Sequence, residues 1–137
     1  MNMSLSVKIG KTYRKSFEAF VKESGYETIS NVEIGEKIDG TPMKADLVIH
    51  PNRKRRTVIF FRTQTVSGTA ENKVPFDAIN ADHAAGKNDK VYLVLAGKGW
   101  GLKKKKFFTT ELSKKIGIRV KVVSEADFRT LVVRKAV

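Results

Sequence analysis

The chain has 137 residues, with 27 Lys and Arg against 14 Asp and Glu, a formal net charge of +13 at pH 7, and no cysteine. This length suits one domain with its own core, and the lack of cysteine excludes disulfides and thiolate metal sites. No run approaches the roughly 18 apolar residues of a membrane span, and residues 1–10 lack the apolar segment of a signal peptide, so we expect a soluble, cytoplasmic protein with no membrane partner.

The first half of the chain predicts one helix followed by three strands. Apolar residues at helical spacing predict a helix over 11–24. Alternating or continuous apolar residues then predict strands over 28–34, 45–50 and 57–63, with a turn-rich loop over 35–43. The second and third strands are close enough in sequence to form a hairpin.

The second half predicts helices alternating with strands. A helix is expected to begin near Lys73, and a nearly all-apolar run over 91–96 predicts a strand buried on both faces. A lysine-rich helix is expected to end at Gly117, followed by a strand over 118–123 and a short helix capped by Ser124. The whole order predicts a single α/β domain over the full chain, a mixed-sheet sandwich with helices on both faces.

The charge points to a polyanionic partner. Basic residues gather in four clusters, at 53–56, 103–106, 114–115 and 134–135. Such clusters on a small domain favour nucleic acid, although charge alone would also suit a ribosome-associated, RNA-binding or membrane-surface protein. The residues expected to contact nucleic acid in the first two clusters are Arg53, Arg55, Lys103, Lys104, Lys105 and Lys106.

Two further residues are candidates for nucleic-acid contact. Trp100 lies between two glycines beside the four lysines, where it could stack on a base or fold back onto the edge of the core. Ser67 lies in a Ser-Gly turn, where it could contact the ligand or simply form the turn.

The stretch from Gln64 to Phe76, Gln-Thr-Val-Ser-Gly-Thr-Ala-Glu-Asn-Lys-Val-Pro-Phe, is the most informative in the chain. It is similar to a segment of the form Q-x-x-S-G-T-A-E-x-K-x-P, which some bacterial and phage members of the PD-(D/E)XK superfamily carry just after their catalytic E-x-K. The predicted element order over 11–123 also resembles that superfamily. The resemblance implies a restriction-endonuclease-like αβββαβ core with added C-terminal elements, and a DNA endonuclease of phage or mobile-element type.

In this register the catalytic motif is altered. The resemblance places Asp46 at the superfamily's metal-binding Asp, but Phe60 stands at the Glu position and Arg62 at the Lys position. Phe60 cannot supply an oxygen ligand to Mg²⁺. Arg62 stays protonated, so it can hold a phosphate but is a poor proton acceptor.

Two hypotheses follow from the altered motif. In the first, the site is rearranged: Asp46, the backbone carbonyl of Phe61 and a carboxylate from Glu71 or Glu18 hold Mg²⁺ or Mn²⁺. The expected catalytic residues are then Asp46, Glu18, Arg62, Gln64, Glu71 and Lys73, with Lys73 or Arg62 orienting water. Very-short-patch-repair nucleases resemble this case, because they also carry Phe where relatives have Glu.

In the second hypothesis, catalysis is lost and a nuclease-shaped DNA-binding protein remains. Each candidate also has a purely structural interpretation. Asp46 could cap a turn, Glu18 could be solvated, and Glu71 with Lys73 could belong to the first turn of a helix. If the chain does cut both strands of a duplex, its single site requires a homodimer.

Overall fold

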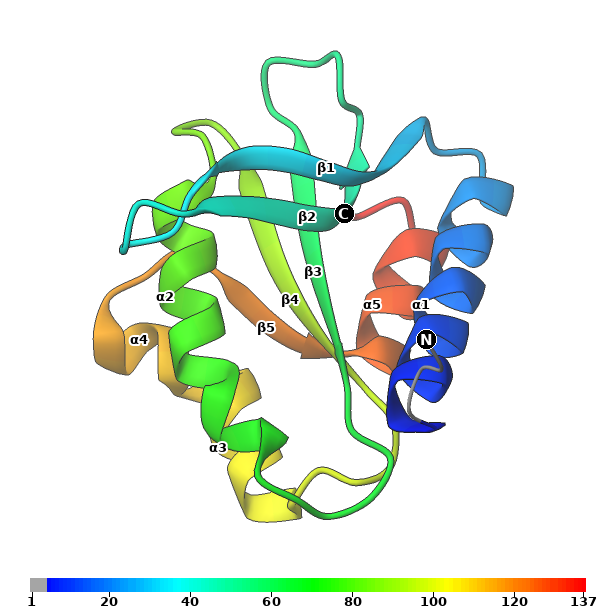
Figure 1. The fold of residues 1–137 in the computed structure, drawn as a ribbon. Coiled ribbons are helices and arrows are strands. Elements are labelled where there is room, and N and C mark those ends of the chain that lie inside the picture. The colour runs from blue at the N-terminus through cyan, green and yellow to red at the C-terminus, as the bar shows by residue number, and fades with distance from the viewer. Residues whose placement is uncertain (1–4) are drawn as a thin grey trace.

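A five-stranded mixed sheet organises the fold, with its strands in the order β1-β2-β3-β4-β5 (Figure 1). The structure is a computed structural model and describes residues 5–137. The strands are β1 (Thr28–Glu36), β2 (Pro42–Ile49), β3 (Thr57–Thr63), β4 (Lys90–Ala96) and β5 (Lys121–Ser124). The first three strands are antiparallel neighbours, whereas β4 runs parallel to β3 and β5 parallel to β4. The predicted mixed sheet is therefore confirmed, with β3 at its centre.

Helices cover both faces of this sheet (Figure 1). Two of them, α1 (Leu5–Glu23) and α5 (Glu125–Val133), pack on one face, where Phe17 and Phe128 join a fully buried cluster. The helices on the opposite face are α2 (Val74–Ala84), which follows the short 3-10 turn η1 (Ala70–Lys73), α3 (Leu102–Thr110) and α4 (Leu112–Ile116). Because β3 and β4 lie between these two layers, their apolar runs are buried on both sides.

Several element boundaries differ from the predictions. The loop expected over 35–43 is a tight hairpin, closed by a 2.8 Å hydrogen bond from the Lys37 amide to the Thr41 carbonyl, so β2 begins at Pro42. The lysine-rich helix is two helices that meet at Glu111. The last strand begins at Lys121 rather than at 118, because the backbone and side chain of Arg119 are bonded to the end of α2. Within the described residues, no helix combines the length and the apolar character needed to cross a membrane.

Candidate functional site

Asp46 lies where β2 and β3 stop pairing. The β2–β3 ladder ends at Leu47 and Ile59, and Figure 1 shows β2 crossing over β3. Beyond that point, the Phe61 amide of β3 donates to the Asp46 side chain of β2, at 2.7 Å from Oδ2. A carboxylate therefore takes the place of a backbone carbonyl as the partner of this amide. On the other side of β2, Asn31 of β1 lies between the paired residues Ser30 and Val32 and has a positive φ of 51°.

The guanidinium of Arg62 lies against the same carboxylate. Its Nη1 is 3.6 Å from Asp46 Oδ2 and donates to the Phe61 carbonyl at 3.0 Å. Its Nε donates to Asp77 Oδ2, on the first turn of α2, at 2.9 Å. Arg62 therefore joins two carboxylates and one backbone carbonyl from three different elements.

Helix α1 completes the cluster from the other side. Arg14 Nη1 lies 3.8 Å from Asp46 Oδ1, and Arg14 Nε lies 3.9 Å from Glu18 Oε1. The hydroxyl of Ser30, on β1, donates to Glu18 Oε2 at 3.4 Å. These longer distances describe a looser ion-pair network than the one around Arg62.

Burial dominates the titration of the two central carboxyl groups. Loss of solvent raises the pKa of Asp46, and the Phe61 amide, Arg62 and Arg14 only partly oppose this. Burial also raises the pKa of Glu18, where Arg14 opposes the change and the nearby Asp46 charge adds to it. The cluster therefore holds negative charge that its own arginines do not fully stabilise.

A hollow of about 380 Å³ adjoins the cluster. Lys11 and Arg14 from α1 line it together with Phe61, Arg62 and Thr63 from the end of β3. Three cationic side chains facing one hollow provide donors and positive charge suited to a phosphate group. The cluster thus combines buried carboxylates with a basic entrance.

Gln64 and Glu71 form a second cluster instead of joining Asp46. The Glu71 amide donates to Gln64 Oε1 at 3.1 Å, and Gln64 Nε2 donates to the Gly99 carbonyl at 2.8 Å. The Glu71 carboxylate accepts from the Gly101 amide at 3.1 Å and lies 3.4 Å from Lys104 Nζ. The Gly101 hydrogen bond is the main reason why the pKa of Glu71 is lowered. These contacts fasten the loop after β3 to the loop before α3.

Glycine permits this close contact between the two loops. A Cβ on Gly97 would lie 2.4 Å from the Gln64 carbonyl oxygen, and one on Gly99 would lie 2.4 Å from that of Val66. Trp100 follows directly and is only 6% exposed, with its Nε1 donating to the Ala96 carbonyl at 2.7 Å. Of the two alternatives for Trp100, the structure shows the second: the glycine-flanked loop folds back onto the core, so the indole is not available to stack on a base.

The remaining predicted residues lie apart from Asp46. Lys73, at the end of η1, is exposed and has no ion pair within the part of the chain that the structure describes. The residues predicted to contact nucleic acid are accessible apart from Trp100: Ser67, Arg53, Arg55, Lys103, Lys104 and Lys106 are exposed, and Lys105 is half-buried.

Sequence reasoning missed Lys11, Arg14 and Asp77. Each lies on an exposed or half-buried helix position of ordinary appearance. Arg14 stands four residues before Glu18, a spacing that could have drawn attention to it.

Comparison with known proteins gives the family of this chain. The family description that matches is the PD-(D/E)XK nuclease superfamily domain, over residues 5–134. The chain belongs to the PD-(D/E)XK nuclease superfamily. No curated protein matches it.

Two solved structures show similarity to this chain. The small subunit of the heterodimeric restriction endonuclease R.BspD6I is similar, with a TM-score of 0.53 and 14% identity over 90% of this chain and 67% of that one. A protein of unknown function, AF1548, has a TM-score of 0.45 and 15% identity over 82% of this chain and 57% of that one. The chain thus spans about three fifths to two thirds of these neighbours' lengths.

PD-(D/E)XK nucleases generally use divalent metal ions, but the residues present here do not fit one. Phe60, which the resemblance places at the Glu position, is 1% exposed and packs in the core with Val74 and Ala78. Glu71 is engaged in the loop cluster, so it does not replace the missing ligand. Asp46 Oδ2 already accepts from the Phe61 amide and pairs with Arg62. The Phe61 carbonyl already accepts from Arg62. Among residues 5–137, no group of three His, Cys, Asp or Glu side chains could hold a metal ion.

Proposed function

We propose that this chain binds DNA through the nuclease fold, and that the guanidinium of Arg62 takes the place of the metal ion at its centre. The supporting observation is the position of Arg62 Nη1, 3.0 Å from the Phe61 carbonyl and 3.6 Å from Asp46 Oδ2. A metal ion in a nuclease site needs oxygen ligands of this kind. Here a permanently charged side chain uses them instead.

The basic hollow beside the cluster supports DNA as the ligand. Lys11, Arg14 and Arg62 would hold a backbone phosphate in the cavity of about 380 Å³. The lysines of α3 lie at the same end of the sheet, since α3 follows the carboxyl end of β4, the strand parallel to β3 (Figure 1). Phosphate contacts of this kind position a protein on DNA without reading its sequence.

A second candidate function is DNA cleavage by an endonuclease. The observation that favours it is the grouping of carboxylates around Arg62, with Asp46 and Asp77 both paired to it and Glu18 linked to Asp46 through Arg14. Cleavage would require Arg62 to leave these carboxylates when DNA is bound. The homodimer expected for cutting two strands belongs to this candidate and stays a prediction.

A plasmid assay tests the two candidates together. The wild-type protein should retard supercoiled plasmid in a gel and leave it uncut with Mg²⁺ or Mn²⁺. Nicking by the wild type that disappears in Asp46→Ala would overturn the proposal in favour of the endonuclease. Absence of retardation at low salt would exclude DNA as the ligand, because phosphate binding is strongest there.

A further inference from the structure

A second basic surface lies at the opposite end of the sheet from Asp46. It surrounds a cavity of about 470 Å³, where the turn before β3, the turn before β4 and the start of β5 meet. These segments converge because β3, β4 and β5 are parallel, with Thr57 paired to Lys90 and Tyr92 paired to Lys121. Five residue steps along β3 separate Thr57 from Arg62, or about 16 Å. The cavity is therefore distinct from the hollow beside Arg62.

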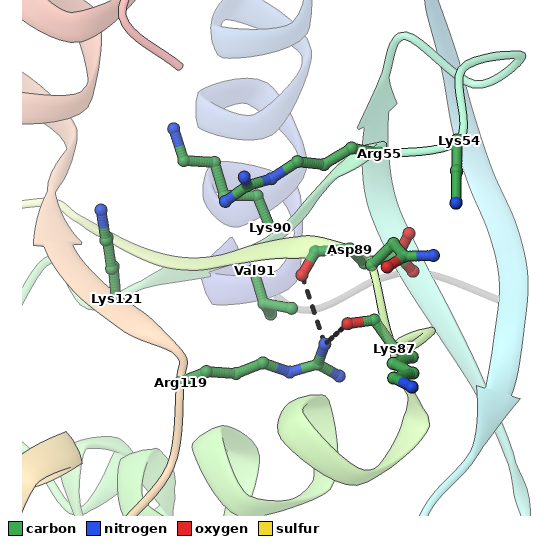
Figure 2. Close-up of a pocket in the computed structure, with 9 residues that line it drawn as sticks. Lys54, Arg55, Lys87, Asp89, Lys90, Val91, Arg119 and Lys121 are labelled. Carbon is green, nitrogen blue, oxygen red and sulfur yellow. Dashed lines mark hydrogen bonds between the residues drawn. The ribbon is translucent and has the colours of Figure 1, made fainter.

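Two arginines support this cavity: Arg119 lines it, and Arg56 holds Asp89, which also lines it. Arg56 forms a bidentate pair with Asp89, at 3.0 and 2.7 Å. Arg119 bonds the Asp82 carboxylate and the carbonyls at the end of α2, including that of Ala85 at 2.9 Å. Figure 2 shows Arg119 reaching into the turn and donating to the carbonyls of Lys87 and Asp89. The acidic groups of the region are thus already paired to these arginines.

The other cations around the cavity have no such partners. Arg55, Lys87, Lys90 and Lys121 make no ion pair with any acidic residue in the range 5–137. Arg55, Lys90 and Lys121 all line the cavity, and Figure 2 shows that they come from different segments. Burial lowers the pKa of Lys90, and the nearby charges of Lys121 and Arg55 lower it further. An anion placed here would relieve this repulsion.

The basic surface continues beyond one cavity. A neighbouring hollow of about 610 Å³ shares Arg55 and Lys90 with the first and adds Arg53 and Lys135. A strip of cations of this extent is longer than a single phosphate group requires. It suits a ligand with repeated phosphates, such as a nucleic-acid backbone, better than a small anion.

We propose that these two hollows form a second phosphate-binding surface for the nucleic-acid backbone, centred on Arg55, Lys90 and Lys121. This inference rests on the proposed function and extends it. The domain then binds nucleic acid at both ends of its sheet. The contacts here are to phosphate, so they add affinity rather than sequence preference.

The test compares two triple variants of the full chain with equal loss of charge. In the first, Arg55, Lys87 and Lys121 are each replaced by Gln, leaving the half-buried Lys90 intact. In the matched control, the exposed Lys22, Lys114 and Lys115, which lie outside both hollows, are replaced by Gln. Binding to a 24-bp duplex is measured by fluorescence anisotropy over a range of salt concentrations, and circular dichroism checks folding.

The first variant should bind at least tenfold more weakly than the control at about 0.1 M salt. The slope of log K against log salt should fall by about 2 to 3, near 0.9 for each lost phosphate contact. Equal loss in both variants would overturn this inference alone, whereas failure of the wild type to bind would overturn the proposed function with it. Inorganic tripolyphosphate is titrated in parallel. If it binds at Lys90 while the first variant keeps its affinity for the duplex, the surface is assigned to a small polyphosphate instead.

Discussion

The ion pair between Asp46 and Arg62 is the main difference between this site and a metal-dependent one. Phe60, which the resemblance places at the superfamily's Glu position, packs in the core. Arg62 meanwhile reaches back to the Phe61 carbonyl and across to Asp77. In the register that the resemblance implies, Phe60 puts packing in place of a metal ligand, and Arg62 puts a fixed charge in place of a titratable amine.

The pairing of Asp89 with Arg56 beside the second basic surface can be tested through the pKa of Asp89. Burial alone would raise the pKa of Asp89, but hydrogen bonds from Arg56 and the Gly86 amide outweigh it, so the pKa lies below its ordinary value of 3.8. The group therefore stabilises the fold above pH 4 and loses this contribution as the pH falls through its folded pKa.

We expect Asp89→Asn to lower the free energy of unfolding by about 2 kcal/mol at pH 7, because Arg56 loses its buried partner. The difference from wild type should shrink below pH 4, measured by urea unfolding across that range. The exposed Glu33→Gln is a control and should change stability by less than about 0.5 kcal/mol. An Asp89→Asn effect of the same size at pH 7 and pH 3 would contradict this account of the pair.

At the scale of elements, apolar patterning was enough to locate the sheet. The runs in β3 and β4 predict strands because both faces must be apolar between two helix layers. The start of α5 was also predictable, since the Ser124 side chain accepts from the Asp127 amide as an N-cap does. Asp46 and Arg62, which the resemblance places in one site, form an ion pair in the structure.

Contacts between loops were not predictable in the same way. Gln64 and Glu71 bond to a loop about 30 residues further along the chain, and nothing local to them identifies that partner. Trp100 is buried because two glycines let the loops touch, which only the folded arrangement reveals. Arg14 and Asp77 likewise lie on helix surfaces whose partners come from β2 and β3.

Gly99→Ala tests the docking of these two loops. Its Cβ would lie within 2.6 Å of three backbone atoms of Val66, so the loops must separate, and we expect a loss of about 2 kcal/mol or more in unfolding free energy. The single tryptophan, Trp100, reports the change directly by fluorescence during urea unfolding. Gly68→Ala is the matched control, because its Cβ would meet only the Val66 carbonyl oxygen at 3.9 Å. Equal stability of the two variants would mean that the loops are not held this closely.

At the scale of the whole molecule, positive charge lies at both ends of the sheet. The lysines of α3 and the hollow beside Arg62 lie at one end, and the cavity around Lys90 lies at the other. With a net charge of +13, the molecule favours association with polyanions over a wide area.

Substitution of the α3 lysines tests the first of these two ends. Changing Lys103, Lys105 and Lys106 to Gln should weaken duplex binding regardless of sequence and lower the salt slope by about 2 to 3. Lys104 is left unchanged because it contacts Glu71 and Asn72 and so supports the loop. Anisotropy titrations at several salt concentrations measure the slope. An unchanged slope would remove α3 from the DNA interface.

Paramagnetic broadening with Mn²⁺ tests most directly whether Arg62 occupies the place of a metal ion. In ¹H–¹⁵N spectra of the wild type, Mn²⁺ should not selectively broaden the Phe61 amide, because Arg62 engages Asp46 and the Phe61 carbonyl. In Arg62→Ala, the freed oxygens of Asp46, Asp77 and Phe61 should bind the ion, and the Phe61 signal should disappear at low Mn²⁺ concentration. Adding Asp46→Asn to that variant should restore the signal. Selective broadening of Phe61 in the wild type, at the same Mn²⁺ concentration as in Arg62→Ala, would contradict the claim.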